Sequence, residues 1–363
     1  MTSDPGLASW LQLTLTPGLG TATIRGLLTQ FGLPENVIGA PRAELARFAG
    51  REALNALGSE AVAKEVERAL AWLAQPGNSV VTLADAAYPS LLLEISDPPA
   101  LLYCRGRTEL LNKHALALVG SRNATAQGMS STEQFARSFS AAGLTIVSGL
   151  AQGIDAAAHR GGLACEGSTI AVLGTGVDIT YPRSNAALAD EIAQRGLLLS
   201  EFPLGTKALA HNFPRRNRLI SGLAQGCLVI EAALASGSLI TARAAADQGR
   251  EVFAVPGSIH SPLSKGCHAL IKSGAKLVES AEDVLSELAA FRRTGFASTR
   301  SPAQDGAATD DPLLHCMGFD PVDVDSLCAR AHLPAERVSA ELLRLELAGR
   351  VAVLPGGLYQ RLN

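Results

Sequence analysis

The strongest constraint on the fold is an alternation of short apolar runs and helical segments that begins at Leu116. The strand-like apolar runs are residues 116–119, 144–147, 169–173, 197–199, 227–230, 251–255 and 276–278. Amphipathic helical segments fall between most of them, at residues 130–142, 155–161, 185–195, 238–248 and 265–272, and a helix at 281–291 closes the series. Strands that alternate with helices form βαβ units, so the pattern predicts an α/β fold with a parallel sheet covered on both faces.

The segments before this alternation predict a separate helical region. Apolar spacings of three and four predict helices at residues 10–15, 23–31, 42–48 and 59–74, and two further strands follow at 79–83 and 100–104. The sequence TPGLG at 16–20 joins the first two helices, with Thr21 as the expected N-cap. It resembles a helix-hairpin-helix turn of a SAM-like domain, whose backbone N–H groups can hold a DNA phosphate. A purely structural helical domain is the alternative.

The C-terminal segment predicts a third folded part. Residues 324–331 and 335–348 predict two helices, and residues 350–362 predict a hairpin around Gly356 and Gly357, which together form a winged-helix pattern. The second helix carries three acids and two bases, so we expect it to contact protein rather than the DNA major groove. The expected division is a helical domain at 1–75, a sheet domain at 76–292, a flexible linker at 293–311 and a winged-helix domain at 312–363.

Charge and cysteine usage limit the classes of protein that fit. The chain has 363 residues and a formal net charge of -3, which excludes a uniformly basic nucleic-acid coat but permits a basic patch. The six cysteines lack metal-site spacing, so we expect thiols in a reducing compartment and no metal or cofactor. The N-terminal residues lack a basic secretory leader, and no apolar run is long enough for a membrane helix. We therefore expect a soluble cytoplasmic protein.

Small residues follow the predicted strands where a ligand would bind. In an open parallel sheet, ligands lie beyond the carboxyl ends of the strands. Glycine there lets the backbone approach an anion, and hydroxyl groups and helix N-termini add donors. The residues with this character that we predict to bind phosphate are Gly120, Ser121, Ser148, Gly149, Gly237 and Ser238, and similar pairs follow the strands at 169–173 and 251–255. Packing alone also favours glycine in such turns, and this is the alternative for any single position.

A local cationic cluster lies in the segment 200–221. No carboxylate occurs between Glu201 and Glu231, yet four basic residues do, namely Lys207, Arg215, Arg216 and Arg218. Phe213 and Pro214 directly precede the arginines. Guanidinium groups beside an aromatic ring suit the phosphates and bases of single-stranded nucleic acid. A solvated basic loop that leads into a helix is the other interpretation.

The sequence offers few candidates for catalytic residues. The chain has neither a complete GxGxxG nor a GxxxxGK[ST] motif, which disfavours a dinucleotide enzyme and a P-loop hydrolase. Asp155 and His159 would share one helix face, but Asp155 is more simply an N-cap. Glu231 could bind a ribose hydroxyl or cap a loop. We assign no catalytic residue and keep a nucleotide-binding or nucleotide-hydrolysing enzyme as the alternative function.

Five motifs together resemble the DNA processing protein A (DprA/Smf) family. They are GSR at 120–122, SGLAQGIDAAAH at 148–159, AVLGTG at 171–176, NFPRRNRLISGL at 212–223 and SGSLITA at 236–242. The resemblance spans about residues 80–290. It implies a Rossmann-like, doubly wound domain that binds single-stranded DNA, dimerises and is not an enzyme. It also implies a recombination mediator that protects incoming single strands and loads the recombinase RecA onto them in natural transformation.

The resemblance also assigns roles to individual residues. It implies that Arg122 contacts phosphate and that Phe213 stacks on a base. Gly237 and Ser238 would complete an anion cradle. The residues implied to line, buttress or order the positive pocket are Arg215, Arg216, Asn217 and Arg218. Members often carry a basic residue shortly before the Phe-Pro pair, where this chain has Leu209 and Ala210, and Lys207 is the nearest base.

Overall fold

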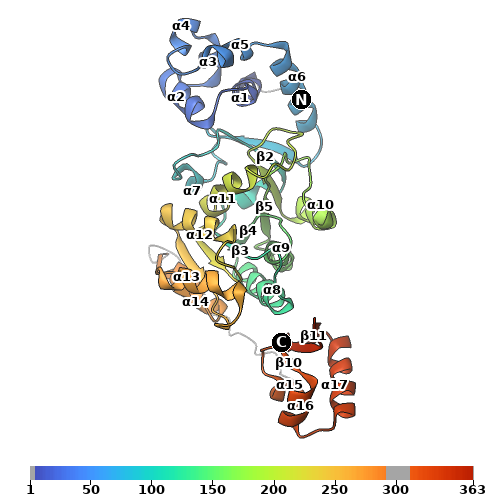
Figure 1. Ribbon diagram of the computed structural model, residues 1–363. Coiled ribbons are helices and arrows are strands. Elements are labelled where there is room, and N and C mark those ends of the chain that lie inside the picture. The colour runs from blue at the N-terminus through green and yellow to red at the C-terminus, as the bar shows by residue number, and fades with distance from the viewer. Residues whose placement is uncertain (1–4, 292–310, 363) are drawn as a thin grey trace. The chain divides into compact units, whose positions relative to one another are not determined.

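The computed structural model describes residues 5–291 and 311–362 (Figure 1). The N-terminal helices and a nine-stranded sheet form one compact unit, and the C-terminal elements belong to a second. The predicted linker at 293–311 lies outside the described residues except for Asp311, which is the N-cap of a helix.

The large sheet has the expected parallel centre. Its strands are β1 (Asn78–Thr82), β2 (Leu101–Gly106), β3 (Ala115–Val119), β4 (Thr145–Ser148), β5 (Thr169–Val172), β6 (Leu197–Ser200), β7 (Gly226–Val229), β8 (Glu251–Ala254) and β9 (Lys276–Leu277). The order is β1-β2-β6-β5-β4-β3-β7-β8-β9, and β3 to β9 pair in parallel, whereas β1 and β2 pair antiparallel. The chain runs outward from β3 to β6 and then returns to β7 beside β3. This reversal creates a switch point, where open α/β sheets bind ligands.

Helices cover both faces of the sheet, which confirms a doubly wound Rossmann-like fold. Strand residues alternate between two apolar clusters: Ile170 and Val172 belong to one, and Ala171 belongs to the other. The helical elements of this region are α7 (Ser90–Leu93), η1 (Thr108–Asn112), α8 (Ala126–Ala141), α9 (Ile154–Leu163), η2 (Arg183–Asn185), α10 (Ala186–Arg195), α11 (Asn212–Gly222), α12 (Ser238–Asp247), η3 (Pro262–Ser264), α13 (Lys265–Lys272) and α14 (Ala281–Phe291).

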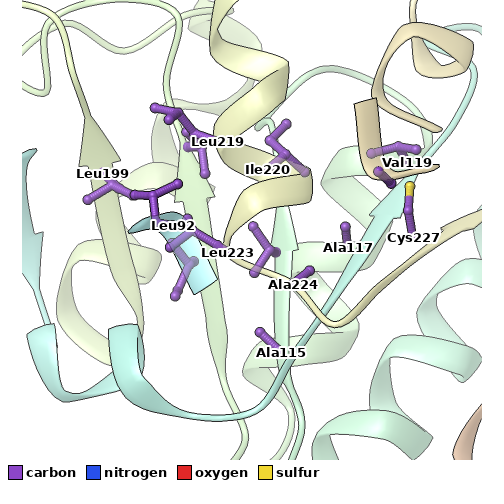
Figure 2. Packing of buried hydrophobic residues seen from close by; sticks show 14 of the residues in the cluster. Leu92, Ala115, Ala117, Val119, Leu199, Leu219, Ile220, Leu223, Ala224 and Cys227 are labelled. Carbon is purple, nitrogen blue, oxygen red and sulfur yellow. The ribbon is translucent and has the colours of Figure 1, made fainter. Parts of the chain in front are cut away.

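The helix α11 carries the predicted basic cluster, and its apolar face fixes it against the sheet. Leu219, Ile220 and Leu223 are almost fully buried and belong to one apolar cluster with the strand residues Ala117, Val119 and Leu199 (Figure 2). Each buried Leu or Ile contributes about 1.5–3 kcal/mol relative to an exposed one. Because this face is anchored, the N-terminal turns of α11 are held at the carboxyl edge of the sheet.

The N-terminal helices share a core with one face of the sheet. Their bounds are α1 (Pro5–Leu15), α2 (Thr21–Phe31), α3 (Pro34–Gly39), α4 (Arg42–Leu45), α5 (Arg51–Ala56) and α6 (Glu60–Leu73). Trp72 contacts Tyr103 of β2 edge to face, with 5.9 Å between the ring centroids. The predicted N-cap Thr21 is wrong: Gly20 is the N-cap of α2, and no side chain caps this helix. Gly20 has the extended backbone conformation of an N-cap residue, and Thr21 is already the first residue of the helix.

The C-terminal unit is a winged helix, as expected. It contains α15 (Pro312–Met317), β10 (Val322–Asp323), α16 (Val324–Ala331), α17 (Ala335–Leu347), β11 (Val351–Leu354) and β12 (Leu358–Arg361), with strand order β10-β12-β11. The sequence prediction lacked α15 and β10, which are short. In neither described part of the chain is a helix long and apolar enough to span a membrane.

Candidate nucleic-acid interface

A cavity of about 770 Å³ lies at the switch point, beyond the carboxyl ends of β3 and β7. Its wall combines backbone-rich turns, one buried and one exposed arginine, and two aromatic rings. Residues that line it include Gly120, Ser121, Arg122, Asn123, Asp155, Tyr181, Phe213, Arg216, Asn217, Ser236, Gly237, Ser238 and Thr241. The cavity therefore brings together motifs that are more than 100 residues apart in the sequence.

The turn after β3 is packed tightly against the turn after β7. The Ser121 N–H donates to the Glu231 main-chain oxygen at 2.7 Å. A Cβ atom at Gly120 would lie 2.6 Å from the Ile154 side chain and 2.9 Å from the same Glu231 oxygen. Glycine is therefore required at position 120 for close packing, and Ser121 and Arg122 are held at the cavity wall.

The N-terminus of α12 forms another part of the cavity wall. Gly237 is its N-cap and makes no side-chain cap, and the first turn contains no acid. The hydroxyl groups of Ser236 and Ser238 lie 2.7 Å apart at this end. A helix N-terminus presents N–H groups and partial positive charge, so this wall suits an anion.

Arg216 is directed inward and supports the loop that follows β4. Its Nη1 donates to the Gly149 oxygen at 2.7 Å and also to the Val172 oxygen, and its Nε donates to Asn217 Oδ1 at 3.2 Å. Arg216 is 4 % exposed, and burial lowers the pKa of its guanidinium to about 10. A Cβ atom at Gly149 would lie 2.6 Å from this guanidinium, so glycine allows the contact.

Asp155 and His159 accept hydrogen bonds from the same loop. One Asp155 oxygen accepts from the N–H groups of Gly149 at 3.1 Å and Ala151 at 3.3 Å. His159 Nε2 accepts from the Leu150 N–H at 3.2 Å. Burial raises the pKa of the Asp155 carboxyl, and the positive charge of Arg216 opposes that rise. The N-cap of α9 is Gly153, so the interpretation of Asp155 as the N-cap is wrong.

Ser148 and Gly149 do not line the cavity. The Ser148 hydroxyl is fully buried and donates to the Leu118 oxygen at 2.6 Å. Gly149 has its N–H on Asp155 and its oxygen on Arg216. These polar groups therefore have partners within the fold.

The two remaining arginines of α11, Arg215 and Arg218, lie close to Glu201, the last carboxylate before the basic cluster in the sequence. Arg218 makes a two-pronged ion pair with Glu201, with N–O distances of 2.7 and 2.8 Å. It also lies 3.5 Å from Asp97. Arg215 is half exposed, lies 3.5 Å from Glu201, and stacks its guanidinium 5.6 Å from the Phe202 ring centre. The three arginines of α11 therefore have different surroundings: Arg216 is bonded inside the fold, Arg218 pairs with Glu201, and Arg215 lies over the Phe202 ring.

The exposed cation at the cavity is Arg122. Its guanidinium carbon lies 5.8 Å from the centre of the Phe213 ring, which is itself half buried. Lys207 is exposed but does not line the cavity, whereas its neighbours Ala208 and Ala210 do.

The sequence analysis did not include Tyr181, an exposed aromatic residue at the wall of the same cavity. Its position in the segment after the β5 glycines was the available clue.

Family models match both folded parts of the chain. Residues 79–289 match the model described as DNA recombination-mediator protein A, and residues 297–357 match the DprA winged helix domain. Protein Smf of Escherichia coli K12 is 45 % identical over 306 residues, which cover 83 % of this chain and 82 % of the relative. DNA processing protein DprA of Streptococcus pneumoniae is 50 % identical over 206 residues, or 57 % of this chain and 73 % of the relative.

Two solved structures are similar as well. The X-ray structure of DprA from Streptococcus pneumoniae has a TM-score of 0.64 and 40 % identity, and the match covers 79 % of this chain and 99 % of that chain. DprA from Helicobacter pylori, described for its single-stranded DNA binding mode, has a TM-score of 0.54 and 31 % identity, with coverage of 59 % and 97 %.

Fold and site together define a doubly wound α/β protein with an anion-suited cavity at the switch point of its sheet. The matching models, relatives and structures narrow that class. The chain belongs to the DNA recombination-mediator protein A (DprA/Smf) family.

Proposed function

We propose that this chain is a non-enzymatic recombination mediator that binds single-stranded DNA in the switch-point cavity. It protects incoming single strands and helps to load the recombinase RecA onto them during natural transformation, in the cytoplasm and as a homodimer. The observation that carries the proposal is the meeting of Arg122, the Phe213 ring and the α12 N-terminus around one cavity. The single-stranded DNA binding mode described for the Helicobacter pylori relative supports it.

In this proposal the predicted residues divide into those that touch DNA and those that shape the site. Arg122 at the cavity wall, and Lys207 and Arg215 outside it, are exposed cations and bind phosphates along the strand. The cavity-lining donors complete the anion cradle: Gly120, Ser121, Asn217, Gly237 and Ser238. Phe213 offers an aromatic surface to the bases. Ser148, Gly149, Arg216 and Arg218 buttress this surface, because their polar groups are engaged inside the fold.

A single strand fits this arrangement better than a duplex. Bases of a single strand are unpaired and can lie against a ring while their phosphates reach cations and helix N-termini. The base faces of a duplex are already stacked on one another. We therefore expect binding that prefers single strands and depends on salt.

A nucleotide-hydrolysing enzyme remains the competing function. Asp155 is the carboxylate that such an enzyme would use at the cavity, but it accepts two backbone N–H bonds and supports a loop. A catalytic acid or base needs a proton position within reach of the substrate. The engagement of Asp155 therefore favours a mediator over a hydrolase.

The test compares single-stranded and duplex oligonucleotides of one sequence by fluorescence anisotropy with the native full chain. We expect preferential binding of the single strand. A second assay measures RecA ATPase on single strands coated with a single-strand-binding protein, which the chain should accelerate. Incubation with nucleoside monophosphates should release no free base. Equal affinity for duplex, no effect on RecA, or base release would contradict the proposal.

A further inference from the structure

Tyr181 is an exposed aromatic side chain at the wall of the switch-point cavity. It is 47 % exposed and lines the cavity together with Phe213. The two ring centroids lie 5.5 Å apart, and the ring planes are tilted by 42°. A tilted pair does not stack face to face, so the Tyr181 ring keeps open surface toward the cavity.

Phe213 offers less free ring surface than Tyr181. A Cβ atom at Gly174 would lie 2.7 Å from Phe213 Cδ1, so the ring rests directly against the Gly174 backbone. The Arg122 guanidinium lies over the ring as well. With Gly174 and Arg122 already in contact, the half-buried Phe213 has less ring surface left for a base than Tyr181 has.

The segment that carries Tyr181 is anchored on both sides of the ring. Before it, Asp178 accepts the Gly205 N–H with both oxygens, at 2.9 and 3.0 Å. After it, the Asn185 side-chain amide donates to the oxygens of Leu150 at 3.0 Å and Ala151 at 3.1 Å. An aromatic side chain on a fixed segment loses less conformational freedom when it binds a ligand.

We propose that Tyr181 is a stacking platform for one nucleobase of the bound single strand, beside Phe213 and Arg122. This inference rests on the proposed single-stranded DNA binding and adds a residue and a ligand group to it. The base stacks on the open Tyr181 face, while the adjacent phosphate meets Arg122. Such a contact tolerates any base, because every base has a flat face.

The experiment separates stacking from charge. Binding of a fifteen-nucleotide oligothymidylate and of the same backbone with abasic sites is measured by anisotropy at two salt concentrations. The proteins are the native chain, Tyr181→Ala, Tyr181→Phe and, as a control that removes an exposed apolar side chain outside the cavity, Leu33→Ala (Leu33 is 57 % exposed). Thermal melts verify that all four fold.

We expect Tyr181→Ala to bind the intact oligonucleotide about tenfold more weakly than the native chain, with an unchanged salt slope. Tyr181→Phe and Leu33→Ala should bind like the native chain, and the abasic strand should not distinguish Tyr181→Ala from native. Equal binding of the intact strand by native and Tyr181→Ala overturns the stacking role alone. An equal loss on intact and abasic strands does so too. Absence of any binding by the native chain overturns the proposed function, and the Tyr181 role with it.

Discussion

The Arg216 guanidinium donates a hydrogen bond to the Gly149 main-chain oxygen at 2.7 Å, which ties α11 to the loop after β4. Both residues belong to motifs predicted to bind DNA, yet here they bind each other. The pair links α11 to Asp155 and His159, which accept hydrogen bonds from the same loop. The shape of the cavity wall therefore depends on Arg216, whose guanidinium is hydrogen-bonded to main-chain oxygens inside the fold.

Replacing Arg216 should cost stability. In Arg216→Met, the Gly149 and Val172 oxygens lose their donor and Asp155 loses its compensating charge, so the free energy of unfolding should fall by about 3–5 kcal/mol. Urea denaturation measures this change. Arg122→Ala is the matched control, because Arg122 is exposed and should change stability by no more than about 0.5 kcal/mol. Equal stability of the two variants would contradict the buttress role.

His159 should make the protein less stable in mild acid. Its Nε2 accepts from Leu150 N–H and its Nδ1 contacts the Thr169 hydroxyl, and burial lowers the pKa of His159 from 6.5 to about 3. Between these values the unfolded chain binds the proton and the folded chain does not, so stability falls as pH falls. From pH 7 to pH 5 the loss should be about 2 kcal/mol. The His159→Gln variant should show a flatter pH dependence in urea denaturation. Identical pH profiles would refute the prediction.

The Glu201–Arg218 ion pair should be coupled strongly. The Glu201 side chain is 3 % exposed and Arg218 is 16 % exposed, so Glu201→Gln leaves a poorly solvated cation and should cost about 3 kcal/mol. A double-mutant cycle with Arg218→Met should give a coupling energy of at least about 1 kcal/mol. Additive effects of the two substitutions would mean that Arg218 does not depend on Glu201.

Any substitution of Gly174 should displace the Phe213 ring, which packs directly against the backbone at this position. In Gly174→Ala the new methyl group would lie 2.7 Å from Phe213 Cδ1, so the ring must move and single-stranded DNA should bind about tenfold more weakly. Anisotropy measures the loss. The control is Gly58→Ala, because a Cβ atom there meets nothing within 4 Å. Native affinity in Gly174→Ala would show that the position of Phe213 is unimportant for binding.

The layered fold could be predicted because each parallel strand is a short apolar run bounded by glycine or polar residues. The run at 116–119, for example, became β3, and its neighbours became the parallel centre of the sheet. The antiparallel pairing of β1 and β2 carries no comparable sequence pattern. The short helices α3 and α5 were missed because fewer than two helical turns show no clear periodicity.

The sequence predicted which turns form the site, but it could not predict in which direction their side chains point. Residues 215–218 were predicted as one basic cluster, whereas successive helical positions point about 100° apart. Arg218 meets Asp97, which is 121 residues away in the sequence, and Arg216 meets Gly149, which is 67 residues away. Such distant pairings depend on the tertiary fold, so the sequence alone could not separate the exposed Arg122 from the buried Arg216.

The central claim is tested most directly by the salt dependence of single-stranded DNA binding. With Arg122, Lys207 and Arg215 on phosphates, the logarithm of affinity should fall against the logarithm of salt with a slope of roughly -2 for the native chain. Arg122→Ala should weaken binding and flatten that slope by about 0.7. Arg137→Ala removes an exposed arginine outside the cavity and should match the native chain. A native slope near zero, or an Arg122→Ala variant that binds like the native chain, would contradict the account.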